Sequence, residues 1–287
     1  MYVYPIYRPP SEATSLILQL TLGCSYNQCL FCSSFKNKPF HTRPYETIVQ
    51  HIEQAQHFYP NPQRIFLADA NVLCLQTADL LKYLALIKET FPHVERISSY
   101  GGPLDILRKS EDELRQIRAA GLDMLYMGVE SGSAEVLKFV HKGVTPEEMI
   151  AAGQKVKRMG FTFSCMIISG LGGQEMWESH ALGSARVISA INPDYFGLLT
   201  LIIDDVSPLR PFLADGSLNL LGPEEVMREL HTMVRHCQLD RCVFRANHAS
   251  NYYSFKGVLN RDKDALLAEI SAAIEHGVYR PESGRLQ

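Results

Sequence analysis

Short apolar runs alternate along this chain with longer amphipathic stretches. Runs of β-branched and aliphatic residues predict β-strands, and the amphipathic stretches between them predict helices. The predicted strands cover residues 16–22, 64–68, 96–99, 124–129, 161–169 and 195–203. Each is separated from the next by a segment long enough for a crossover helix. The pattern therefore predicts six βα units.

The predicted strands are almost continuously apolar, which is typical of a parallel sheet that is covered on both faces. Repeated βα units make such a sheet parallel with right-handed connections, as a barrel or as a doubly wound sheet. Two helices are predicted to begin at Thr145-Pro146 and Gly222-Pro223, where acidic residues follow the proline. Gly121 and Gly160 suit helix ends. Beyond about residue 205 the regular alternation fades.

The composition is ordinary for a soluble globular protein of 287 residues, with 46% hydrophobic and 21% charged residues. The net charge is −3 and no long basic run occurs, which argues against a nucleic-acid partner. The N-terminus lacks the basic start and apolar run of a secretion signal. No later stretch reaches the roughly 18 uninterrupted apolar residues of a membrane span. These observations predict a cytoplasmic protein without a membrane partner.

Three of the seven cysteines, Cys24, Cys29 and Cys32, lie within nine positions, directly after the first predicted strand. Loops at the carboxyl ends of strands carry the chemistry in α/β folds, and thiolates favour iron–sulfur clusters or zinc. A structural zinc site needs a fourth protein ligand, for which His41 is the nearest candidate. Three ligands on a cubane leave one iron open, which indicates catalysis.

The spacing Cys24-x4-Cys29-x2-Cys32, with Phe31 before the last cysteine, resembles the cluster loop of the radical S-adenosylmethionine (SAM) superfamily. The commonest form of that loop has three residues in the first gap, so a loop reshaped by one residue is expected here. Four blocks at the ends of later strands resemble the SAM-contacting strand ends of the branch with oxygen-independent coproporphyrinogen oxidases, methylthiotransferases and tRNA-modifying acetyltransferase relatives. They are residues 66–71, 98–100, 128–133 and 168–173.

The resemblance spans residues 15–205 and implies an α/β fold, a partial (β/α)6 TIM-like barrel with a C-terminal α/β extension. Residues 1–205 would form the barrel, and residues 206–287 would cover it without folding independently. The resemblance also implies a single [4Fe–4S] cluster on the three cysteines. Lys142 stands where the oxidases carry an arginine that pairs with the SAM carboxylate. The residues implied to contact SAM are Phe31, Ala68, Asp69, Ala70, Ser99, Glu130, Lys142 and Gly170.

The implied function is reductive cleavage of SAM to a 5′-deoxyadenosyl radical that acts on a small polar substrate. An electron donor such as flavodoxin or ferredoxin would supply the electron. The alternatives are SAM-dependent alkyl or methylthio transfer to tRNA or protein, and a non-catalytic iron–sulfur or zinc sensor. Only 23 residues precede Cys24, so no cobalamin-binding domain is expected before the cluster.

A polar block near the C-terminus, residues 242–253, follows a short strand-like run and is dense in hydrogen-bond donors. Arg245, Asn247, His248 and Asn251 either bind substrate or form a polar network that closes the open side of the barrel, since buried polar groups need partners in both cases. The block resembles the C-terminal end of poorly characterised radical SAM proteins. Cys74 and Cys165 lie in apolar stretches and are expected to be buried free cysteines, whereas Cys237 and Cys242 are too few to hold a second cluster.

Overall fold

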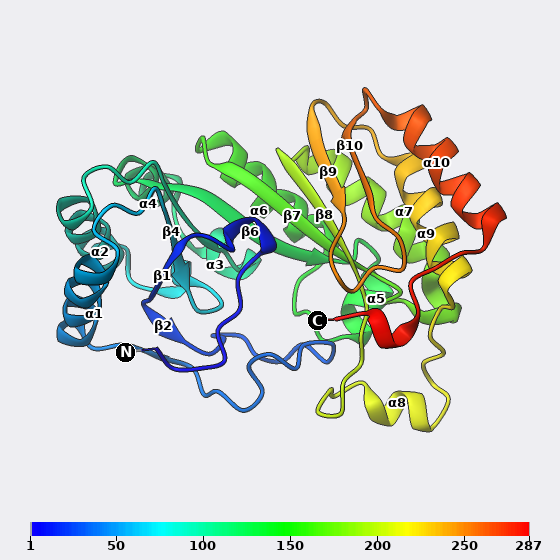
Figure 1. Cartoon of the computed structure of the whole chain (residues 1–287), viewed down its shortest axis with the longest axis horizontal. Helices are drawn as coiled ribbons and strands as arrows, with labels where there is room; N and C mark the ends of the chain where they lie inside the picture. The colour runs from blue at the N-terminus through cyan, green and yellow to red at the C-terminus, as the bar shows by residue number, and fades with distance from the viewer. Residues whose placement is uncertain (1, 287) are drawn as a thin grey trace. The chain divides into compact units, whose positions relative to one another are not determined.

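A computed structural model describes residues 2–286 as strands alternating with helices (Figure 1). Eight strands follow the order β1-β4-β5-β6-β7-β8-β9-β10 in one sheet, and β2 and β3 form a second, two-stranded sheet. The strands are β1 Leu16–Gln19, β2 Thr21–Leu22, β3 His41–Thr42, β4 Arg64–Ala68, β5 Arg96–Tyr100, β6 Leu122–Glu130, β7 Thr162–Ser169, β8 Tyr195–Thr200, β9 Cys242–Ala246 and β10 Phe255–Leu259.

Some of the helices begin at capping residues that the sequence offers. The predicted starts at Pro146 and Pro223 are confirmed, and Thr145 and Glu148 exchange the two hydrogen bonds of a capping box at the first of them. The helices are α1 Tyr45–Phe58, α2 Thr77–Thr90, α3 Pro103–Arg108, α4 Glu111–Ala119, α5 Ala134–Phe139, α6 Pro146–Arg158, α7 Gly173–Ile191, α8 Arg210–Ala214, α9 Pro223–His236 and α10 Lys263–His276. Short 3-10 helices are η1 Pro10–Glu12, η2 Val72–Cys74 and η3 Glu282–Gly284. Within residues 2–286, no helix has both the length and the apolar character needed to cross a bilayer.

The chain divides into two compact units, and the first consists of Met1–Asn27, Ser34–Met127 and Lys155–Phe163. In this unit β4 pairs in parallel with β1 and with β5. The apolar side chains of β4 are completely buried, as the sequence pattern requires of a covered parallel strand. Helix α1 packs against β1 and α2, and α2 also contacts α4.

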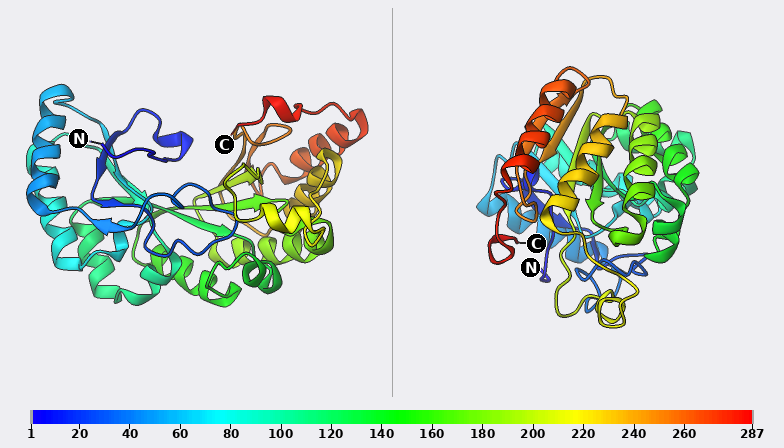
Figure 2. Two further views of the ribbon diagram at one scale, coloured as in Figure 1. Left: turned by 90° about the horizontal axis from the view of Figure 1, so that it is seen from below. Right: turned by 90° about the vertical axis from the view of Figure 1, so that its right-hand side faces the viewer.

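The second unit consists of Gln28–Ser33, Gly128–Gln154 and Ser164–Gln287. Strand β8 pairs in parallel with both β7 and β9, and β10 closes this end of the order by pairing antiparallel with β9. Helix α9 packs between α7 and α10, which Figure 2 shows in its right-hand view. The division into domains at residue 205 stays a prediction.

Two of the predicted strands differ most from the structure. The strand predicted for residues 16–22 is broken at Leu20, whose N–H donates to the Ala68 carbonyl, and the chain then turns to pair β2 with β3. The strand predicted for residues 195–203 ends at Thr200. The alternation also continues further than expected, because α9 leads into β9, which forms the first five residues of the polar block.

Candidate active site

The three cysteines of the triad lie on a loop whose two ends are joined by the short sheet of β2 and β3, where Leu22 pairs with His41. All three side chains are partly exposed, and none of them forms a disulfide bond. Cys24 belongs to the first unit, whereas Cys29 and Cys32 belong to the second. Within residues 2–286, no three His, Cys, Asp or Glu side chains are arranged to hold one metal ion. A cubane differs from such a site, because each cysteine binds a different iron.

The sulfur of Cys24 accepts a hydrogen bond from the N–H of Asn27 at 3.4 Å. Asn27 adopts a left-handed conformation, with φ of 48°, and its side-chain amide donates to the Phe35 carbonyl at 3.1 Å. Lys36 donates to the Asn27 carbonyl at 2.9 Å. The first turn of the loop is therefore held in a shape that directs a backbone donor toward the first sulfur.

Asp69, at the carboxyl end of β4, joins the two ends of this loop. Its carboxylate accepts the N–H of Gly23 at 2.9 Å and lies 2.6 Å from Nζ of Lys38. The amide of Gln19 donates to the other carboxylate oxygen at 3.1 Å. The side chain of Asp69 is fully buried, and that of Lys38 is 7% exposed. Such a buried ion pair fixes where the loop leaves and re-enters the fold.

Gly23 begins the loop in a conformation that favours glycine, with φ of 70°. A Cβ atom at this position would lie 2.3 Å from the carbonyl oxygen of Lys38. Any larger residue would therefore push apart the two chain segments that Asp69 joins.

In the second unit, three residues that the resemblance implicates in SAM binding lie together. Nζ of Lys142 is 3.1 Å from the Glu130 carboxylate and 5.7 Å from the centre of the Phe31 ring. Burial opposes the positive charge of Lys142, but Glu130 and the thiols of Cys29 and Cys32 together raise the pKa of Lys142 above its ordinary value. The N–H of Leu30 donates to the carbonyl of Val140 at 2.9 Å, which ties the cluster loop to the segment before Lys142. A largely buried positive charge therefore lies near these two thiols.

The other predicted cofactor residues have different surroundings. Ala68 is buried, and the N–H of Ala70 donates to the Gly23 carbonyl at 3.4 Å. The hydroxyl of Ser99 is buried and donates to main-chain carbonyls of β4 and β5. Gly170, directly after β7, has φ of 80° and lines a cavity of about 210 Å³.

That cavity lies at the carboxyl ends of β7 and β8, inside the second unit. Its walls include apolar side chains before and within the first turn of α9 together with a few polar groups. The other walls include Ser169, Gly170, Thr200, Leu201, Tyr252 and Arg285. Apolar walls with a few placed polar groups are typical of small-molecule sites.

The polar block of the C-terminal region is only partly buried. Arg245 is exposed on β9 and donates to the carbonyls of Phe244 and Gly257, while Asn247 is also exposed. His248 is half-buried, its Nδ1 lies 2.9 Å from the Ser250 hydroxyl, and burial lowers the pKa of His248.

Asn251 is buried, and it bridges the end of β8. Its side-chain oxygen accepts the Thr200 hydroxyl at 3.0 Å, and its amide donates to the Leu198 carbonyl at 2.9 Å.

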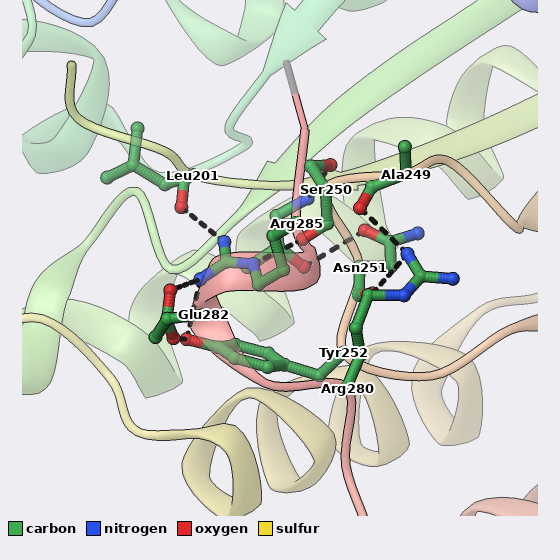
Figure 3. Close-up of polar contacts among 9 residues, drawn as sticks. Leu201, Ala249, Ser250, Asn251, Tyr252, Arg280, Glu282 and Arg285 are labelled. Carbon is green, nitrogen blue, oxygen red and sulfur yellow. Dashed lines mark hydrogen bonds and ion pairs between the residues drawn. The ribbon is translucent and has the colours of Figure 1, made fainter.

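Two arginines near the C-terminus, which sequence reasoning missed, hold this block in place (Figure 3). Arg285 donates to the carbonyls of Leu201 and Ser250 at 2.8 and 2.6 Å, and its guanidinium lies 4.1 Å from the centre of the Tyr252 ring. Arg280 donates to two further carbonyls of the block, at 2.7 and 3.0 Å. Arg285 and its partner Glu282 thus form part of the cavity wall.

Comparison with known proteins places these residues in a family context. The family model described as the radical SAM superfamily matches residues 18–182, which is more than half of the chain. An uncharacterized methyltransferase of Pyrococcus horikoshii is 25% identical over 146 residues, which are 50% of this chain and 30% of the methyltransferase.

Solved structures show the same fold. Coproporphyrinogen III oxidase from Escherichia coli, a radical SAM enzyme, aligns with a TM-score of 0.56 and 20% identity over 77% of this chain and 51% of the oxidase. Methylornithine synthase aligns with a TM-score of 0.55 and 16% identity over 93% of this chain and 82% of the synthase. The chain therefore spans about a third of the methyltransferase and about half of the oxidase. The predicted α/β fold of partial-barrel type is confirmed.

Proposed function

Since this chain belongs to the radical SAM superfamily, we propose that Cys24, Cys29 and Cys32 bind its cluster and that the strand ends described above bind SAM. The protein is an enzyme that uses a [4Fe–4S] cluster and SAM. When bound, the cluster supplies the electron that cleaves SAM and releases the 5′-deoxyadenosyl radical. The protein's own residues bind, orient and shield the reactants.

The chemistry of the donor set fits such a cluster. None of the three thiols forms a disulfide bond, and backbone N–H donors to cluster sulfurs are among the contacts that tune iron–sulfur centres. Asn27 supplies one such donor at Cys24. Lys142 adds a positive charge near Cys29 and Cys32, which offsets the negative charge of thiolate ligands.

The ion pair of Lys142 and Glu130 supports a role in SAM binding, because a bound amino acid presents an ammonium and a carboxylate of matching charge. Glu130 has a left-handed backbone conformation, with φ of 64°, and its carboxylate pairs with Lys142. The Asp69 carboxylate is already engaged by the cluster loop. Contacts of Ala68, Asp69 and Ala70 with SAM therefore fall to their backbone groups in this proposal.

SAM affinity of a Glu130→Ala variant tests this assignment. Loss of a charge-assisted hydrogen bond weakens binding about tenfold to a hundredfold. Equilibrium dialysis of the anaerobically reconstituted protein measures the affinity, and the visible spectrum reports on the cluster. The matched control is Glu135→Ala, which removes an exposed carboxylate from α5. An unchanged affinity in the Glu130 variant, with an intact cluster, contradicts the assignment.

The substrate in this proposal is a small polar molecule. It is bound by the polar residues Arg245, Asn247, His248 and Asn251. Two observations support this role: Asn251 reaches the end of β8, and its segment borders the cavity through Tyr252. Reductant and substrate are general needs of radical SAM enzymes, and flavodoxin or ferredoxin would serve as the reductant.

One test needs no identified substrate. It compares SAM cleavage by the dithionite-reduced protein with and without a small-molecule fraction of cell extract. Arg245→Met is expected to keep the basal cleavage and to lose any stimulation by the fraction. Arg241→Met, which removes another exposed arginine just before β9, is the control and is expected to keep both. If the fraction still stimulates SAM cleavage in the Arg245 variant, the proposed role of Arg245 in substrate binding is contradicted.

A further inference from the structure

A carboxylate without a close positive charge is buried beneath the cavity at the end of β7. Glu229, on α9, is completely buried, and its Oε1 accepts the Ser169 hydroxyl at 2.5 Å and the Gly170 N–H at 2.9 Å. Its Oε2 has no hydrogen-bond partner among residues 2–286. A buried acid costs free energy that an apolar residue would not, so its two hydrogen bonds need explanation.

His180, on α7, extends this contact to the end of β6. Its ring is completely buried, and Nε2 lies 3.8 Å from Oε1 of Glu229. Its Nδ1 is 2.8 Å from the hydroxyl of Ser131, the residue directly after Glu130. The Ser131 hydroxyl also accepts the Ser133 N–H at 3.1 Å. The imidazole therefore lies between the acid on α9 and the segment that follows β6.

The end of β6 is also fixed to α7 by the main chain. The N–H of Gly132 donates to the Ser184 hydroxyl at 2.9 Å. A Cβ atom on Gly132 would lie 2.1 Å from the carbonyl oxygen of Gly183, so the two backbones are as close as glycine permits. The segment that follows Glu130 is thus in direct backbone contact with α7.

Burial favours the uncharged forms of both side chains. It raises the pKa of Glu229 to about 7, although the hydrogen bonds from Ser169 and Gly170 lower it in part. It lowers the pKa of His180 to about 4, against a smaller opposing effect of the Ile168 carbonyl. In these forms the pair can keep its hydrogen bonds to the strand ends without an uncompensated buried charge.

We propose that Glu229 and His180 are positioning residues for SAM binding, which hold from α9 and α7 the two strand ends that carry Gly170 and Glu130. This inference rests on the proposed function, in which both strand ends contact SAM. Neither Glu229 nor His180 is among the residues that line the cavity. Glu229 fixes Ser169 and Gly170 in the cavity wall, and His180 fixes the turn after Glu130.

Three substitutions on α9 test the role of Glu229 through the SAM dissociation constant of the reconstituted protein. Glu229→Met removes the acceptor and is expected to weaken SAM binding about tenfold, since the Gly170 N–H then lacks a partner. Glu229→Gln keeps an acceptor oxygen and is expected to stay within about threefold of wild type. The control Glu224→Met removes an exposed carboxylate of the same helix and leaves the affinity unchanged. Iron content and the visible spectrum are expected to match wild type in all three.

A merely structural role predicts a different result: Glu229→Met would lower the melting temperature and leave SAM affinity unchanged, which overturns the proposal. Should that variant not fold, Ser169→Ala decides, because it removes one donor and leaves the Gly170 hydrogen bond. It is expected to weaken SAM binding about fivefold, and an unchanged affinity overturns the proposal. The Glu130→Ala variant distinguishes a failure of the proposed function from a failure of this inference. If it does not weaken binding, the proposed function fails; if it does and the Glu229 and Ser169 variants do not, only this inference fails.

Discussion

Replacing Asp69 by asparagine is expected to destabilise the first unit and the cluster loop that it anchors. The Asp69 carboxylate is buried and has three donors around it, from Gly23, Gln19 and Lys38. Asparagine keeps one acceptor oxygen but removes the charge. Lys38 is then left as a buried ammonium with the carbonyls of Val3 and Pro5 as its hydrogen-bond partners.

The magnitude follows from the burial of the pair. Removing one partner of a buried ion pair costs about 3–5 kcal/mol, because the remaining charge is uncompensated. The two carbonyl acceptors of Lys38 place the expected loss near the lower end, at about 3 kcal/mol. Replacing both residues, in Asp69→Leu with Lys38→Met, removes both charges and is expected to recover part of that loss.

Urea denaturation followed by circular dichroism measures these losses. The pair Asp79–Lys82 is a matched control in the same unit, since its side chains are 50% and 66% exposed. Lys82→Met is expected to cost less than about 1 kcal/mol. The Asp69 variant is also expected to retain less iron after reconstitution. A loss below about 1 kcal/mol in Asp69→Asn, with normal iron retention, refutes the reasoning.

Three further predictions concern the second unit. Glu229 has a raised folded pKa of about 7, so its contribution to the free energy of unfolding is complete below about pH 4.5 and is lost as the pH rises to about 7. His180 has a lowered folded pKa of about 4, so its contribution to that free energy is complete above about pH 6.5 and is lost as the pH falls to about 4. Relative to wild type, Glu229→Gln should therefore gain about 3 kcal/mol of stability as the pH rises from about 4.5 to about 7, and His180→Gln should gain stability as the pH falls from about 6.5 to about 4. Urea denaturation at several pH values measures both. If the free energy of unfolding changes with pH equally in wild type and in both variants, both pKa shifts are contradicted. Gly132→Ala is expected to cost about 3 kcal/mol in urea denaturation, because its Cβ would meet the Gly183 carbonyl, and a neutral effect would show that the two backbones can separate freely. Arg285→Met removes hydrogen bonds to two carbonyls, a tyrosine hydroxyl and a glutamate, and a thermal melt is expected to show a loss of about 2 kcal/mol; an unchanged melting temperature would mean that this contact contributes nothing to stability.

The strands of the sheet could be predicted from the sequence because their information is local. A run such as residues 64–68 is apolar throughout, and a parallel strand covered on both faces requires that pattern. The helix start at Pro146 was also predictable, since its capping residues are sequence neighbours. The cysteine triad was predictable for the same reason, because its three members lie within nine positions of the sequence.

The polar contacts that support the candidate site could not be predicted, because their partners are distant in sequence. Ser169 and Glu229 are 60 residues apart, and Leu201 and Arg285 are 84 residues apart. One local indication existed for Glu229. It lies on the apolar face of α9 beside Val226 and Leu230, and an acid on that face is unusual unless it has buried partners.

The most direct test of the central claim is SAM cleavage by the anaerobically reconstituted protein reduced with dithionite. Wild type is predicted to show the electron paramagnetic resonance signal of a reduced [4Fe–4S] cluster and to release 5′-deoxyadenosine. Cys24→Ala, Cys29→Ala and Cys32→Ala are each predicted to lose both. Cys74→Ala, which removes a thiol outside the triad, is the control and is predicted to keep both. A Cys29→Ala protein with an unchanged four-iron signal and undiminished 5′-deoxyadenosine release would contradict the assignment of the cluster to these three cysteines.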